Sequence, residues 1–140
     1  MILVDTSVLS LAFRRRRQSQ PEPRPVQIFR RLILEDTPVA IPGIVLQEIL
    51  SGVRTDIQFA RLQRLLEAFS ILTAERQDHV LAAQISNACR RKGLSMSAVD
   101  CLIAALATSR EAFLFTLDED FSRMAPNCGL KLYNTEVRTS

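Results

Sequence analysis

The sequence has few of the residues that common enzyme chemistries require. Its 140 residues include no tryptophan, one tyrosine, one histidine and four glycines. No Gly-rich phosphate loop is present, which excludes nucleotide binding of the P-loop or dinucleotide type. The histidine, His79, has polar neighbours and the chain has no G-x-S-x-G sequence, which argues against a serine or cysteine triad.

Cysteines are also few. Cys89, Cys101 and Cys128 are odd in number and show no C-x-x-C spacing, which argues against a zinc site and against a disulfide framework. We expect reduced thiols, with Cys89 and Cys101 as small core residues on helices.

Long hydrophobic runs are missing as well. The longest stretches without a charged side chain, 37–47 and 79–89, are about half as long as a membrane span of roughly 20 residues. The apolar start of the chain has no basic segment before it and reaches an acid at Asp5, so no secretory signal is expected. The sequence therefore predicts a cytoplasmic protein with no membrane span.

Positive charge is concentrated in one segment. Residues 14–31 hold seven of the 18 cationic residues and a single acid, Glu22. All seven are arginines, which bind phosphate through a planar fork. The part from 14 to 24 contains no apolar residue to bury and includes two prolines, so we expect an exposed loop there.

The composition, 47% hydrophobic and 24% charged, is typical of one globular domain, predicted here to span residues 1–140. Hydrophobic periodicity predicts strands at 1–4, 38–41, 70–72, 112–116 and around 130–133. It predicts helices from after the polar segment 5–7 to about Phe13, at 25–35, from Pro42 to near Gly52, and at 57–69, 75–92 and 98–110, with an acidic turn at 117–121. Alternating strands and helices indicate an α/β fold with a mainly parallel sheet between helical layers.

Acidic residues stand near the strand ends, where open α/β sheets bind their ligands. Asp5 follows the first strand, Glu48 lies in the helix after the second, and Asp100 begins the helix that leads to the fourth. Asp118 and Asp120 follow that fourth strand.

Most of these acids have a structural explanation when taken singly. Asp100 stands where a capping box is expected, and Glu48 alone is typical of a solvated helix face. Asp118 and Asp120 alone are typical of a polar turn. Asp5 has no obvious packing reason, since it is a carboxylate directly after a buried strand.

As a set, however, the acids indicate a metal site. Several carboxylates at one sheet edge repel each other unless cations lie between them. Oxygen ligands without histidine or cysteine favour Mg²⁺ or Mn²⁺. Such ions activate water for attack on a phosphodiester and stabilise the leaving oxygen.

The motifs around these acids resemble those of PIN-domain nucleases, specifically the small VapC-type toxins of bacterial toxin–antitoxin pairs. They are Asp5 in ILVDTSVL, Glu48 in IVLQEIL, Asp100 in MSAVDCLIAALA, and Asp118 and Asp120 in LFTLDEDF. The resemblance covers essentially the whole chain. It implies a PIN-like three-layer α/β/α sandwich with a mainly parallel central sheet.

The resemblance also implies a Mg²⁺- or Mn²⁺-dependent endoribonuclease in which these five acids hold the metal. In the family a hydroxyl after the first Asp assists, a role that falls here to Thr6 or Ser7, and Thr116 matches the Thr that leads the last motif. Asp118 matches the usual fourth acid, and Asp120 stands at a position that is acidic in some members. Both remain candidates for the fourth ligand.

The partners that the resemblance implies are an RNA substrate, a cognate VapB-like antitoxin and a second copy of the chain in a homodimer. The amphipathic helices predicted within 25–35 and 44–69 offer apolar surface that fits a groove for a partner helix. The loop at 14–24 is longer and more basic than the family's minimal pattern. Its run of Arg14, Arg15, Arg16 and Arg17 contacts RNA phosphates, docks an acidic antitoxin tail, or is a solvated loop; the sequence leaves all three open.

Two other functions stay open. One is a catalytically silent PIN-like binding module, although no acidic position of the pattern is missing. The other is a phosphoacceptor α/β domain, which needs an Asp after a central strand and a Lys near the last strand. Here the strand at 70–72 leads to Thr73, and Lys131 lies within the final strand.

Overall fold

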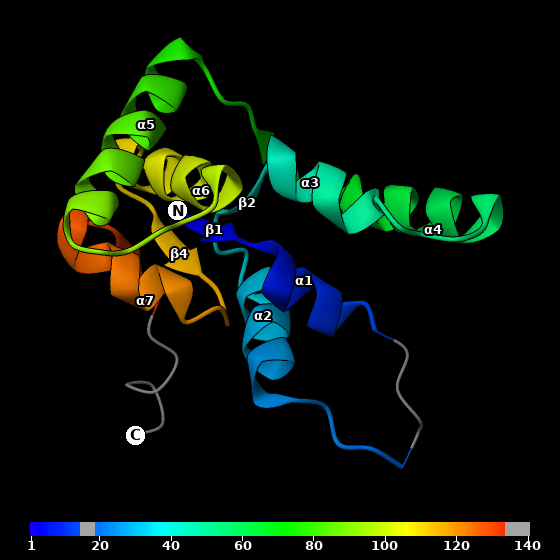
Figure 1. Ribbon diagram of the computed structural model, residues 1–140. Helices are drawn as coiled ribbons and strands as arrows, with labels where there is room; N and C mark the ends of the chain where they lie inside the picture. Colours follow the sequence, from blue (N-terminus) through cyan, green and yellow to red (C-terminus); the bar gives the residue numbers. More distant parts are fainter. Residues whose placement is uncertain (15–18, 134–140) are drawn as a thin grey trace, which may run out of the picture.

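A five-stranded sheet forms the centre of the computed structural model, which describes residues 1–14 and 19–133 (Figure 1). Its strands are β1 (Ile2–Val4), β2 (Val39–Pro42), β3 (Ser70–Leu72), β4 (Phe113–Phe115) and β5 (Lys131–Leu132). They run parallel to one another in the order β3-β2-β1-β4-β5. The predicted parallel sheet is confirmed.

The first strand, β1, lies at the middle of this sheet, and its three residues are all aliphatic. Ile2, Leu3 and Val4 are all buried, because β1 has neighbouring strands on both edges and is covered on both faces. A continuous aliphatic run is what such a strand requires.

Helices cover both faces of the sheet. They are α1 (Thr6–Ala12), α2 (Arg24–Leu34), α3 (Gly43–Leu50), α4 (Asp56–Leu66), α5 (Arg76–Arg91), α6 (Ala98–Ser109) and α7 (Asp120–Met124), the last followed by a 3₁₀ turn at Ala125–Asn127. In the view of Figure 1, α5 and α6 lie above the sheet, and α1 and α2 lie below it, whereas α7 lies beside the lower end of α5, which the 3₁₀ turn after α7 contacts. The α/β sandwich is thereby confirmed. The helices α3 and α4 extend away from the sheet to the right.

A glycine cap ends helix α5. Gly93 has a φ of 79°, in the left-handed region that favours glycine. The N–H of Gly93 donates to Arg90 O at 3.0 Å, and the N–H of Leu94 donates to Cys89 O at 2.9 Å. This pair of bonds is a Schellman motif, which satisfies the last carbonyls of the helix.

One predicted element is wrong. The segment LDEDF was expected to be a turn only, but α7 begins at Asp120, within that segment. Phe121 and Met124, three residues apart on this helix, are both fully buried. Their burial in the core stabilises a helical turn that is too short to show periodicity in the sequence.

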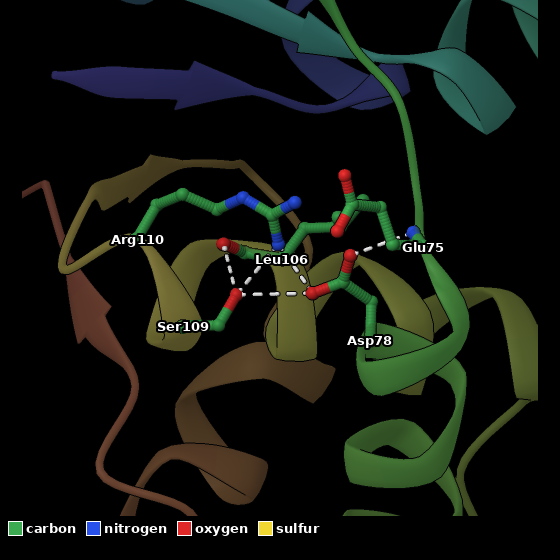
Figure 2. A network of polar contacts seen from close by, with 5 residues as sticks. All are labelled: Glu75, Asp78, Leu106, Ser109 and Arg110. Atoms are coloured by element: carbon green, nitrogen blue, oxygen red, sulfur yellow. Dashed lines mark hydrogen bonds and ion pairs between the residues drawn. The ribbon is translucent and has the colours of Figure 1, made fainter.

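A buried polar network joins α5 to α6 (Figure 2). Asp78 is 3% exposed, and its Oδ2 accepts the backbone N–H of Glu75 at 2.8 Å, at the start of α5. Its Oδ1 accepts the Ser109 hydroxyl at 3.1 Å and pairs with the Arg110 guanidinium, at the end of α6. The network fixes the first turn of α5 to the last turn of α6, the helix that carries Asp100.

Cys89 and Cys101 are buried in the core, as predicted. No helix within the described residues has both the length and the apolar character needed to cross a bilayer.

Candidate metal centre

The candidate site lies where β1 and β4 end side by side. Val4 pairs with Phe115, so the residues that follow them, Asp5 and Thr116, leave the sheet at the same edge. From β1 the chain goes on to β2 on one side, whereas β4 lies on the other side. This edge is therefore a topological switch point, the usual place for a ligand in an open parallel sheet.

Asp5 is the buried member of the site, with an exposed fraction of 5%. Its Oδ1 accepts the N–H and the hydroxyl of Ser7, at 3.0 Å and 2.6 Å, and its Oδ2 accepts the Thr116 hydroxyl at 2.7 Å. Burial raises the pKa of Asp5 above its ordinary value, and these hydrogen bonds oppose that rise.

The two hydroxyls also hold the segment after β4. Ser7 Oγ accepts the N–H of Leu117 at 2.9 Å, and Thr116 Oγ1 accepts the N–H of Asp118 at 3.0 Å. Each hydroxyl has one proton, which it donates to Asp5, and uses a lone pair for the backbone. The position of Asp118 is thus tied to that of Asp5.

Thr6 forms its side-chain hydrogen bond with Glu48 and not with Asp5. Its hydroxyl donates to Oε1 of Glu48 at 2.9 Å, which connects the first residue of α1 to α3. The sequence left open whether Thr6 or Ser7 assists Asp5, and in the structure the hydroxyl that contacts Asp5 belongs to Ser7.

Three carboxylates come together beside Asp5. Asp100, Asp118 and Asp120, called here the acidic trio, each offer an oxygen within 4.8 Å of the other two. Asp100 is placed by the N-cap of α6, where its N–H donates to Ser97 Oγ at 3.0 Å. Asp118 is placed by a further bond, because its Oδ1 accepts the N–H of Asp120 at 2.9 Å.

The electrostatics of the acidic trio are those of a site that needs a cation. Burial raises the pKa of Asp100, and the nearby charges of Asp118, Asp120 and Asp5 raise it further. An ion of Mg²⁺ size has bonds of about 2.1 Å, so it holds opposite oxygens about 4.2 Å apart. The oxygens of the trio lie within 4.8 Å of one another, close to that separation, and oxygen-only donors suit such an ion.

The structure thus gathers most of the predicted site residues. The acidic trio, Asp5, Ser7 and Thr116 share one edge of the sheet. In the part of the chain that the structure describes, Glu48 is not in the trio's cluster and contacts Thr6 instead. Arg14 is exposed after the end of α1, whereas Arg15, Arg16 and Arg17 lie outside the described residues.

One residue at this site was not predicted from the sequence. Arg123 forms an ion pair with Asp120, three residues before it on α7. The signal was the i, i+3 spacing of an acid and an arginine, which places two side chains on one face of a helix. It was not used because this segment was expected to be a turn.

Known proteins share both the sequence pattern and the fold of this chain. The sequence matches the family described as PIN domain over residues 2–126. Ribonuclease VapC11 of Mycobacterium tuberculosis is 35% identical over 127 residues, covering 89% of this chain and 92% of that protein. FitAcB from Neisseria gonorrhoeae has a TM-score of 0.75 and 27% identity, covering 96% of this chain and 97% of that chain. VapBC2 from Rickettsia felis was solved bound to a DNA fragment from the VapBC2 promoter. It has a TM-score of 0.76 and 25% identity, covering 97% of this chain and 100% of that chain.

Proposed function

Because this chain belongs to the PIN domain family, and within it to the VapC ribonucleases, we propose that it is a Mg²⁺- or Mn²⁺-dependent endoribonuclease that hydrolyses phosphodiester bonds of RNA. PIN nucleases generally use a divalent metal ion. The observation that carries the proposal is the acidic trio beside the buried Asp5. We take residues 1–140 to act as a single PIN domain.

The side chains divide the work in this proposal. The acidic trio, Asp5 and Glu48 supply the oxygens for the ion, which when bound activates a water and neutralises charge on the phosphate. Ser7 and Thr116 keep Asp5 in one orientation through its two oxygens. Thr6 orients Glu48.

The substrate follows from the relatives and from charge. VapC11 is named as a ribonuclease, and the formal charge of this chain is +3. We propose that Arg14, which is exposed after the end of α1 at the start of the basic segment, contacts a phosphate of the RNA. A polyanion is drawn to such a segment by long-range attraction. An RNA substrate also agrees with the expected cytoplasmic location.

We also propose a small VapB-like antitoxin as partner, bound in a groove formed by α1, α2 and α4. Two cavities of about 300 Å³ and about 230 Å³ both border Phe13 and Leu65, so they lie next to each other along these helices. Several apolar side chains on its α2 and α4 walls are exposed: Ile33 41%, Leu34 76% and Leu65 50%. An amphipathic helix of the antitoxin covers these side chains in this proposal. VapBC2 is itself a toxin–antitoxin complex with the same fold.

A homodimer is the remaining proposed assembly. A further cavity of about 560 Å³ lies between α5 and α6, on other helices than the antitoxin groove, and has apolar walls that include Val99 and Leu102. Two copies that meet there leave the α1/α2/α4 groove accessible. Light scattering of the purified chain measures its mass directly, and a monomer at micromolar concentration contradicts this part of the proposal.

The enzymatic proposal is tested by removing single carboxylates. Asp5→Asn and Asp100→Asn are each expected to abolish RNA cleavage, and EDTA is expected to abolish cleavage by the wild-type chain. Asp36→Asn is a matched control, because Asp36 is exposed with a φ of 56°, which asparagine also tolerates. Cleavage that survives either site variant in a folded protein, or that persists unchanged in EDTA, contradicts the proposal.

A further inference from the structure

The acidic trio has a cation of the chain's own beside it. The guanidinium of Arg123 pairs with Oδ1 of Asp120, from one turn further along α7. The Arg123 side chain is 61% exposed, so it is not held in place by burial in the core. The Arg123–Asp120 pair therefore changes the net charge at the site more than it stabilises the fold.

The Arg123–Asp120 ion pair places a positive charge next to the three negative charges of the acidic trio. Three carboxylates within 4.8 Å of one another repel each other when no metal ion is present. Among the described residues, Arg123 is the cation that forms an ion pair within this trio. It removes part of that repulsion and at the same time engages an oxygen of Asp120.

Exposure makes the pair easy to break. Asp120 is 38% exposed and Arg123 61%, and exposed ion pairs contribute little because water and salt screen them. A divalent ion with several carboxylate ligands displaces such a partner. The arginine then stays within one side chain's length of the site, with its five donors available.

We propose that Arg123 is a switching counter-cation: it pairs with Asp120 while the acidic trio is empty, and moves to a phosphate of the RNA when a metal ion takes Asp120. This inference rests on the proposed ribonuclease function. Arg123 then has two negatively charged partners, first the carboxylate of Asp120 and later a phosphate of the RNA. Both can accept hydrogen bonds from the planar guanidinium. No covalent step is involved.

The first half of the proposal is tested by metal binding without RNA. Mn²⁺ titrated calorimetrically into the Arg123→Gln variant is expected to bind about two- to fivefold more tightly than into wild type, the range that loss of one exposed ion pair allows. Arg123→Lys keeps the charge and is expected to bind Mn²⁺ as wild type does. Arg64→Gln is the matched control, because Arg64 is an exposed arginine in the last turn of α4, far from α7 in Figure 1.

The second half is tested by RNA binding. A single-stranded oligonucleotide is titrated by fluorescence anisotropy in Ca²⁺ at several salt concentrations, with its integrity checked on a gel. Each phosphate contact to a single strand adds about 0.7 to the slope of log affinity against log salt. Arg123→Gln is expected to lower that slope by about 0.7 and to weaken binding, while Arg64→Gln leaves the slope unchanged.

The outcomes separate this inference from the function on which it rests. If wild type binds Mn²⁺ and RNA but Arg123→Gln shifts neither the Mn²⁺ affinity nor the salt slope, or only one of them, the switching role of Arg123 is wrong and the proposed function stands. If the folded wild-type chain binds no Mn²⁺, the proposed metal site is wrong, and the role of Arg123 with it.

Discussion

Ser7 donates both its backbone N–H and its hydroxyl to the same oxygen of Asp5, at 3.0 Å and 2.6 Å. The hydroxyl in turn accepts the N–H of Leu117, in the segment that carries Asp118. One side chain thus links the acid after β1 to the segment after β4. Since Asp5 is 5% exposed, burial raises its pKa, and the hydrogen bonds from Ser7 and Thr116 oppose that rise.

Ser7→Ala is therefore expected to weaken the metal site more than the fold. The variant removes a hydrogen bond to a buried charged group, which allows the pKa of Asp5 to rise further and releases the N–H of Leu117. We expect metal affinity and RNA cleavage to fall about 10- to 100-fold, the usual cost of losing a residue that orients a ligand. Calorimetry with Mn²⁺ and a cleavage assay measure the two effects. Ser10→Ala, at an exposed position of α1, is the control and should match wild type.

Thr6 and Glu48 are expected to behave as one unit. Thr6→Val removes the hydroxyl that donates to Glu48 and should lower cleavage about tenfold, whereas Thr6→Ser keeps the donor and should retain most activity. Glu48→Gln should lower cleavage further. In the double variant the loss should be smaller than the product of the two single losses, because Thr6 has no charged partner left to orient. Independent, multiplying effects would show that the 2.9 Å contact has no role in catalysis.

Much of this fold is predictable from local chemistry. The aliphatic run at 2–4 predicts a buried strand, and the capping position of Asp100 predicts the start of a helix there; both are confirmed. These features depend on residues close in the chain, so periodicity and capping rules detect them. The placement of Asp5 and Asp118 at one edge follows from the same rules, because adjacent parallel strands end together.

What the sequence did not predict depends on contacts between distant segments. Helix α7 has only five residues and exists because Phe121 and Met124 are buried in a core that the rest of the chain builds. Thr6 and Ser7 are neighbours with the same functional group, and their different distant partners, Glu48 on α3 and the N–H of Leu117 after β4, become visible only in the folded chain. Arg123 could not be connected to the site before α7 was known.

The α1/α2/α4 groove should be separable from the nuclease site. Leu65→Glu places a charge on the shared wall of the two cavities, at a side chain that is 50% exposed, so the fold should tolerate it. Burying that charge against a partner helix is costly, and we expect at least a tenfold loss of antitoxin affinity with RNA cleavage unchanged. Val80→Glu is the control, because Val80 is 51% exposed on α5 and lines neither cavity. Equal antitoxin affinity for Leu65→Glu and wild type would contradict the proposal that the antitoxin binds in the α1/α2/α4 groove.

Asp78 should determine how the fold responds to acid. The hydrogen bond from Arg110 is the main cause that lowers the pKa of Asp78 below its ordinary value. A carboxylate whose pKa is lower in the folded than in the unfolded chain stabilises the fold above the unfolded pKa, about 3.9 for Asp. That stabilisation is lost as the pH falls from about 4 through the lower, folded value. Asp78→Asn is therefore expected to reduce the free energy of unfolding by about 2–3 kcal/mol at pH 7, since it removes hydrogen bonds to a charged, buried group.

The pH dependence distinguishes this role from a loss of packing. Urea unfolding of wild type and Asp78→Asn, measured between pH 7 and pH 3, should give a difference that is constant above about pH 5 and shrinks below about pH 4, as Asp78 itself takes up a proton. Asp36→Asn, at an exposed acid, should follow the wild-type curve closely. A difference between wild type and Asp78→Asn that stays the same down to pH 3 would mean that the shape of the side chain, and not its charge, joins α5 to α6.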